Sequence, residues 1–186
     1  PAKGETICGG DVLMSFGGKG ANQAVAVARL GGEATFISKV GTDANGKMMV
    51  EHFAEEGLCT DTVIQDPTVQ SGSAWIGVGD DGDYSIIVMP GANGAMTVED
   101  LKPFEDAITS SEYLLMQLEV PMAVVEYAAD IAHAAGVKVV LNPAPAAPLK
   151  DSLLSKLYAL TPNETECRIL CGTEASDDDE ATAAVL

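Results

Sequence analysis

Basic side chains are scarce in this sequence. Its 186 residues contain 10 lysines and arginines against 28 aspartates and glutamates, which gives a formal net charge of −18. A chain this acidic repels the phosphate backbone of nucleic acids and the anionic surface of a membrane. We therefore expect neither nucleic acid nor membrane as a partner, and we attribute the charge to solubility.

Long apolar runs are lacking too. No stretch approaches the ~20 apolar residues of a membrane-spanning helix, and residues 1–5 lack the basic start and apolar core of a signal peptide. These features predict a cytoplasmic protein. An apolar fraction of 47% and a charged fraction of 20% are ordinary for a globular chain, and the length suffices for one domain with a sizeable core.

Cysteine and histidine are few. The sequence holds four scattered cysteines and two histidines: Cys8, Cys59, Cys167, Cys171, His52 and His133. Cys167 and Cys171 lie four residues apart and would share a helix face. Without a second pair or a nearby histidine they make a poor zinc site, so we expect free, reduced thiols and structural histidines.

Hydrophobic periodicity predicts helices alternating with strands. The pattern gives helices at 21–30, 43–57, 98–108, 122–135, 151–154, 164–170 and 177–186, and strands at 35–40, 61–65, 113–118, 137–141 and 157–160. Strands alternating with helices predict βαβ units and a parallel sheet. Two further β-rich runs, 73–78 and 84–89, flank a polar turn and predict a hairpin.

Two glycine-rich patterns resemble nucleotide motifs without being them. Residues 77–82 match G-x-G-x-x-G by letter, but they open a second strand, whereas the dinucleotide motif must open a helix. Residues 17–23 (GGKGANQ) are not a Walker A loop, because Gly20 follows Lys19 where Ser or Thr is required.

GGKGANQ is nevertheless the most informative stretch of the sequence. It stands where a strand gives way to a helix, so its glycines allow close backbone approach to a ligand and the first helical amides are free donors. Lys19 adds three donors, and Asn22 adds a donor and an acceptor. Such a cradle suits a small polyhydroxylated molecule.

Further polar residues follow the predicted strands. Glu119, Asn142 and Asn163 come just after strand ends, and Glu166 follows one helical turn later. Ligands of open parallel sheets gather at that edge. Glu119 suits either a sugar hydroxyl or backbone amides, and Asn163 suits a phosphate, a helix N-cap or both. Glu166 is a candidate outer ligand for Mg²⁺.

GGKGANQ, Gly91-Ala92-Asn93, Gln117-Leu118-Glu119, Asn142-Pro143-Ala144-Pro145 and Thr161-Pro162-Asn163-Glu164 occur here in one order. In that order and spacing the chain resembles the ribokinase-type members of the PfkB family of carbohydrate kinases, over nearly its whole length. The resemblance implies an α/β fold, namely a ribokinase-like, Rossmann-type parallel sheet flanked by helices, with a small β-lid. The reaction implied is transfer of the γ-phosphoryl group of ATP to a pentose, D-ribose first, giving ribose 5-phosphate.

The resemblance also assigns roles to residues. Sugar contacts are implied for one set of residues: Gly18, Lys19, Gly20, Ala21, Asn22 and Glu119. Asn163 would lie near the ATP phosphates, and Glu166 belongs to an N-x-x-E pattern that is associated with Mg²⁺. Mg²⁺ and a monovalent cation such as K⁺ are the implied cofactors.

The hairpin has an implied role as the lid. Ala74, Ile76 and Val88 alternate onto one face of it, and an apolar face needs a partner. The resemblance implies lid strands at about 5–16 and 72–89 and a homodimer formed through them. A sheet that covers the protein's own core is the alternative.

One family motif has no counterpart in this sequence. The family places its catalytic base in a G-A-G-D motif; here the nearest match, Cys8-Gly9-Gly10-Asp11, precedes the cradle. We therefore assign no catalytic residue, treat residues 1–186 as a partial domain that lacks the C-terminal part of the fold, and expect no turnover. A kinase for another sugar or a nucleoside, and a non-catalytic sugar-binding or dimerising fragment, remain alternatives.

Overall fold

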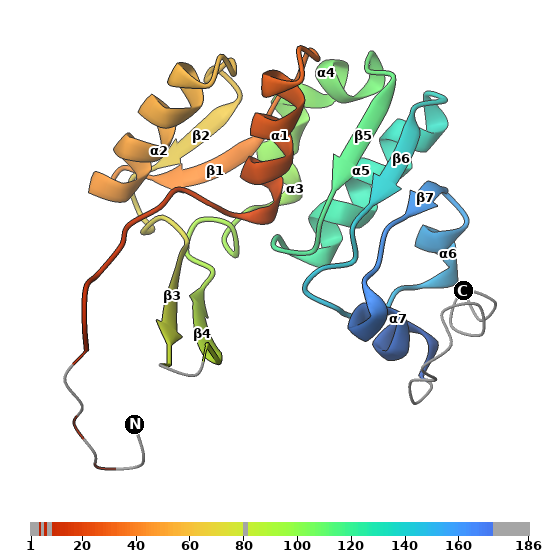
Figure 1. Cartoon of the computed structure of the whole chain (residues 1–186). Helices are drawn as coiled ribbons and strands as arrows, with labels where there is room; N and C mark the ends of the chain where they lie inside the picture. The colour runs from red at the N-terminus through yellow and green to blue at the C-terminus, as the bar shows by residue number, and fades with distance from the viewer. Residues whose placement is uncertain (1–3, 5, 7–8, 80–81, 173–186) are drawn as a thin grey trace.

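The structure is a computed structural model that describes residues 4, 6, 9–79 and 82–172. Two groups of parallel strands lie side by side with helices packed on them, and a hairpin projects below (Figure 1). The first group pairs β1 (Ser38–Gly41) with β2 (Val63–Asp66); the second has the order β5 (Tyr113–Met116), β6 (Lys138–Leu141) and β7 (Leu157–Leu160). The α/β fold with a parallel sheet is confirmed.

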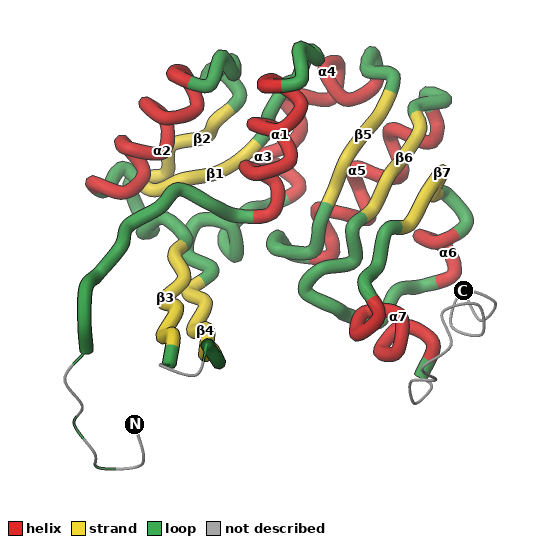
Figure 2. The backbone as a smooth tube through the Cα atoms, viewed as in Figure 1, coloured by secondary structure: helices red, strands yellow, loops and turns green. Residues whose placement is uncertain are grey.

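The helices follow the expected rhythm (Figure 2). They are α1 (Lys19–Arg29), α2 (Ala44–Glu55), α3 (Val98–Leu101), α4 (Glu105–Thr109), α5 (Met122–Ala134), α6 (Asp151–Leu154) and α7 (Glu164–Cys171). The single helix expected at 98–108 is interrupted by the 3₁₀ turn η1 (Lys102–Phe104). Pro103 lies in that turn, and proline cannot donate the hydrogen bond that a continuous α-helix requires. The helix expected at 177–186 lies outside the described residues. None of the described helices has the length and apolar character needed to cross a membrane.

The hairpin has the expected bounds, β3 (Ser73–Val78) and β4 (Tyr84–Met89). Its register pairs Ala74 with Val88 and Ile76 with Ile86, so the three predicted lid residues share one face. Of the strand expected at about 5–16, residues 9–16 carry no strand, and residues 5, 7 and 8 lie outside the described residues. A strand requires hydrogen bonds from a neighbour, and among the described residues the two hairpin strands pair only with each other.

Each group of strands has its own apolar core. Phe53 is the largest buried side chain of the core beside β1 and β2, where its ring meets the edge of Phe36 at 5.1 Å. The larger core lies between α5 and the three-stranded sheet and includes Val125, Val139 and Leu141. No strand pairing joins the two sheets within the described part of the chain, so other contacts must hold them together.

Lys39 supplies one of those contacts. It lies in β1 and is only 7% exposed, and its Nζ is 2.9 Å from Asp66 Oδ2 and 3.1 Å from Asp100 Oδ2. The same ammonium donates to the carbonyl of Ala95. The hydroxyl of Thr68, followed by Lys39, holds the pKa of Asp66 at about 2. Lys39 thus ties β1 to the end of β2 and to α3, which belongs to the other core.

The thiols of Cys59, Cys167 and Cys171 are free, as expected, and Cys8 lies outside the described residues. Burial raises the pKa of the Cys167 thiol. His52 stacks on Phe16, with ring centroids 4.2 Å apart, and therefore contributes to packing.

Replacing Lys39 with methionine will lower the melting temperature markedly. The change keeps the length of the side chain but leaves two partly buried carboxylates facing each other without a cation, and breaking such a pair is strongly destabilising. Thermal unfolding followed by circular dichroism measures the effect. Lys102→Met is the matched control, because Lys102 pairs only with exposed Glu99 at the surface. Equal losses in the two variants would contradict the structural role of Lys39.

Candidate functional site

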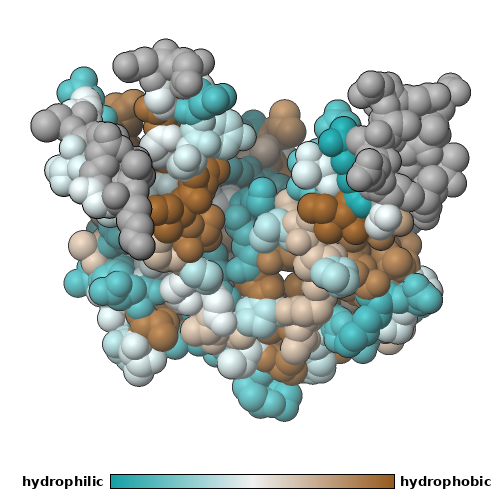
Figure 3. Space-filling model, turned by 90° about the horizontal axis from the view of Figure 1, so that it is seen from below, coloured by the Kyte–Doolittle hydropathy of each residue, from teal (hydrophilic) through white to brown (hydrophobic). Residues whose placement is uncertain are grey.

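A cleft opens at the carboxyl edge of the strands, where β1 and β5 approach the start of α1. Its volume is about 110 Å³. The walls come from the cradle, from the segment after β5 and from the two ends of the hairpin, and include Gly18, Gly20, Ala21, Ser71, Asn93, Gln117 and Glu119. Seen from below, a hydrophilic band runs between hydrophobic areas on either side (Figure 3). Of the polar residues expected to share one wall with the cradle, Glu119 lines the cleft, whereas Asn142, Asn163 and Glu166 are not among its lining residues.

Helix α1 begins without a local cap. Its N-cap residue is Gly18, which offers no side chain, and no acidic residue lies in the first turn. Glu119 takes over this role from 100 residues away, since its Oε2 accepts from the backbone N–H of Lys19 at 2.8 Å. A carboxylate at this end of a helix is stabilised by the helix dipole and by the free amides. Of the two partners expected for Glu119, a sugar hydroxyl or backbone amides, the structure shows a backbone amide.

The predicted sugar residues divide between two places. Gly18, Gly20, Ala21 and Glu119 line the cleft. The exposed Asn22 instead lines a separate depression of about 470 Å³, together with residues from 15–17 and α2. Lys19 reaches the site through its backbone N–H, and its side chain is not among the lining groups.

Asp43 and Ser71 fix the base of the hairpin against β1 and α2. Asp43 Oδ1 accepts from Gly46 N and from Ser71 Oγ at 2.8 and 2.7 Å, and Oδ2 accepts from Ser71 N at 2.9 Å. Ser71 Oγ in turn accepts from Gly41 N. These donors, led by the Gly46 amide, hold the pKa of Asp43 below its usual value. The wall of the cleft at Ser71 is therefore rigidly placed.

Asn163 and Glu166 form a capping box at the start of α7. Asn163 Oδ1 accepts from Glu166 N at 2.8 Å, and Glu166 Oε2 accepts from Asn163 N at 2.9 Å. Asn163 Nδ2 also donates to Glu166 Oε1 at 3.1 Å. Both oxygens of Glu166 are thus engaged and the residue is buried, an arrangement that does not fit direct coordination of Mg²⁺. The described residues contain no cluster of three metal-binding side chains.

Sequence reasoning did not assign roles to Gln117, Ser71 or Asn93. For Gln117 a signal existed, because it stands two residues before Glu119, and alternate residues of an extended segment point to the same side. Ser71 and Asn93 carry no such signal. They line the cleft because the segment before β3 and the segment after β4 both lie beside it.

A parallel α/β sheet with a polar cleft beyond its carboxyl edge is typical of proteins that bind small molecules. The chain matches the family described as pfkB family carbohydrate kinase over residues 2–186. It belongs to that family.

Individual relatives narrow the comparison. The chain is 48% identical to a ribokinase of Haemophilus influenzae, with 97% of this chain and 59% of the relative aligned. It is 35% identical to a deoxyribokinase of Salmonella typhi, with 99% and 60% aligned. The structure of Arabidopsis thaliana ribokinase complexed with ribose and ATP superposes with a TM-score of 0.90 at 31% identity, covering all of this chain and 60% of that one. The chain thus spans about three fifths of the length of these relatives.

Replacing Gly46 with alanine will destabilise the protein, although alanine is the better helix former. A Cβ at Gly46 would lie 1.9 Å from the carbonyl oxygen of Gly41, whose amide is held by Ser71. Urea unfolding measures the loss. Gly77→Ala is the control, because nothing lies within 4 Å of a Cβ there. A Gly46→Ala protein as stable as the Gly77→Ala protein would refute this close approach.

Proposed function

We propose that the complete protein in which this chain occurs is an ATP-dependent sugar kinase that converts D-ribose to ribose 5-phosphate in the cytoplasm. The observation that carries the proposal is the 48% identity to a ribokinase over nearly the whole chain. The likeness to a ribokinase structure with ribose and ATP supports it. This chain supplies the sugar-facing wall and the lid.

The cleft is suited to a neutral sugar. Glu119 uses Oε2 to cap α1, while Oε1 accepts from no donor among the described residues and is open to a sugar hydroxyl. The glycines at 18 and 20 let hydroxyls approach the backbone closely. Asn22 joins these contacts in this proposal through its amide, which is exposed one turn into α1.

The nucleotide belongs at the α7 side of the edge. We assign to Asn163 a position near the ATP phosphates, supported by its place at a helix N-terminus. Mg²⁺ would arrive with the ATP phosphates, which supply the hard oxygen ligands that it prefers. Phosphoryl transfer rests on positioning and charge stabilisation, and the carboxylate base would come from outside this chain.

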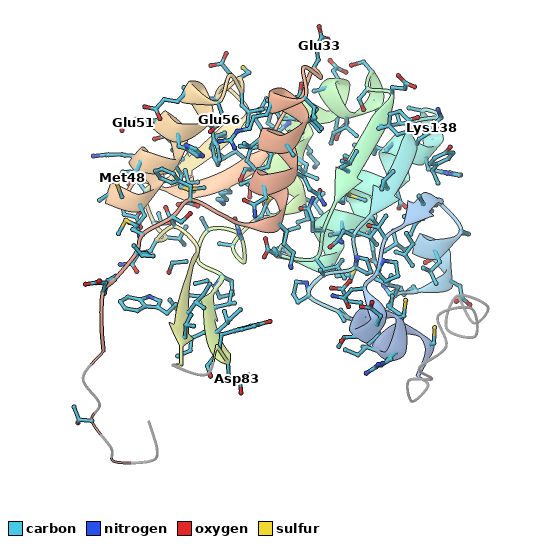
Figure 4. All side chains as sticks on the ribbon, in the orientation of Figure 1. Glu33, Met48, Glu51, Glu56, Asp83 and Lys138 are labelled. Atoms are coloured by element: carbon cyan, nitrogen blue, oxygen red, sulfur yellow. The ribbon has the colours of Figure 1, made fainter. Side chains whose placement is uncertain are left out.

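In the complete protein, Glu119→Gln and Asn22→Ala will weaken ribose binding, because each variant removes a group that pairs with a sugar hydroxyl. Loss of such a pair typically costs about tenfold or more in affinity. Isothermal titration with ribose measures the effect. Glu33→Gln is the control, because Glu33 lies at the opposite edge of the molecule (Figure 4). If either site variant binds ribose as tightly as the wild type, that residue is not a sugar contact.

Deoxyribose is the second candidate substrate, favoured by the 35% identity to a deoxyribokinase. The same titration with 2-deoxyribose separates the two. Tighter binding of ribose supports a site that pairs with the 2-hydroxyl, and tighter binding of deoxyribose would transfer the assignment.

We further propose that the hairpin mediates a homodimer. Seven of its large apolar side chains are at least half exposed: Trp75, Ile76, Val78, Tyr84, Ile86, Ile87 and Val88. An exposed apolar surface of this kind marks an interaction site. Val12, Leu13 and Met14 are exposed apolar side chains as well.

Ile76→Asp will shift the complete protein from dimer to monomer, because a charge opposed to its own copy across an apolar face is costly. Sedimentation velocity gives the oligomeric state. Leu30→Asp is the control, since Leu30 is equally apolar and 88% exposed but lies at the far end of α1. A dimer that persists in Ile76→Asp, or a wild type that is monomeric, would overturn the proposed interface.

A further inference from the structure

Two side chains of the segment after β5 reach the first two turns of α1. Gln117 Nε2 donates to Gln23 Oε1, and Glu119 Oε2 accepts from Lys19 N. Between them Leu118 turns into the larger core, and its amide donates to the carbonyl of Ala144. The segment therefore continues the alternation of β5 and presents Gln117 and Glu119 on one side.

The contact at Gln117 is closely fitted. A Cβ on Gly20 would lie 2.9 Å from Gln117 Oε1 and 3.4 Å from the ring of Phe36. A larger residue at position 20 would therefore force the end of the Gln117 side chain to shift from its place across the start of the helix. Gln23 stands one helical turn beyond Lys19, so the two hydrogen bonds hold consecutive turns of α1.

The hydrogen bonds of Glu119 and Gln117 to α1 have different roles. Glu119 both caps α1 and, in the proposed function, accepts from the sugar, so its carboxylate must serve the helix and the ligand at once. Gln117 touches the helix through Gln23, at a point that the sugar-facing amides do not occupy. Its bond can therefore fix the position of the cradle independently of the ligand.

We propose that Gln117 is a positioning residue, which orients the sugar-binding first turn of α1 against Glu119 through its amide bond to Gln23. This inference rests on the proposed function. Loss of the bond leaves the Glu119 cap as the remaining hydrogen bond of the two from this segment to α1, so the cradle and the carboxylate keep their spacing less strictly. Sugar affinity then falls, while phosphoryl transfer from bound sugar does not.

The test uses the complete protein and Gln117→Met, which keeps the shape of the side chain and removes its hydrogen bonds. We expect the Kd and KM for ribose to rise about fivefold to tenfold, the effect of one lost hydrogen bond, with kcat within twofold of wild type. Gln117→Glu should restore most of the affinity, because the amide of Gln23 can rotate and donate to the carboxylate. Gln65→Met is the matched control, because Gln65 is an exposed residue of β2.

Pairing the variants sharpens the test. If Gln117 acts through Gln23, the double variant Gln117→Met/Gln23→Met binds ribose no more weakly than either single variant. Each single variant already removes the same hydrogen bond, the one between Gln117 and Gln23. A role in stability alone would lower the melting temperature without changing the Kd, and that result overturns the inference. So does a Kd for Gln117→Met within twofold of wild type, or additive losses in the double variant. A wild type that binds no ribose would instead refute the proposed function, and this inference with it.

Discussion

The joint between the two groups of strands is the constraint on which the rest of this structure depends. Each group has its own core, and in the described residues no ladder of backbone hydrogen bonds connects them. The joint includes the ion pair of Lys39 with Asp100, the hydrogen bonds from the segment after β5 to α1, and the packing of Ile37 against the larger core. The cleft lies at this joint, because the joint brings the cradle, the carboxylate of Glu119 and the base of the hairpin to one place. Stability and ligand binding therefore share the same few polar contacts.

The hairpin follows a different physical rule. Its base is packed so closely that a Cβ at Gly72 would lie 2.8 Å from the carbonyl oxygen of Pro90, whereas its strands stand free with apolar side chains exposed on both faces. Such a segment gains little from its own fold and much from burial against something else. A fixed base and exposed apolar strands suit a lid or a dimer contact. The base sets the position of the two strands, and the strands are stabilised by the surface that they cover.

Local pattern sufficed for much of this fold. The hairpin bounds agree with the expectation, since alternation and turn chemistry act within a few residues, and the strand at 157–160 was likewise placed. Pro103 divided the expected helix at 98–108, a local effect of the proline on the backbone. The strand expected at 5–16 is absent from residues 9–16, because strand formation depends on a partner that hydropathy does not encode.

In the site, Glu119 was found from its place after a strand, but its capping of α1 joins residues 100 apart. The separation of Asn22 from the cleft is equally non-local, since it depends on which face of α1 turns toward β5.

The charge of the cleft is consistent with a neutral ligand. The carboxylate of Glu119 caps α1, and a protein of net charge −18 offers little to offset a second negative group beside it. A free sugar brings hydroxyls that accept and donate without adding charge, so it can share Glu119 with the helix. A phosphorylated sugar would bring about two negative charges close to the same carboxylate, with Lys19 the nearest basic residue in the cradle sequence. Electrostatics at this edge is therefore compatible with the proposed ligand, an unphosphorylated sugar.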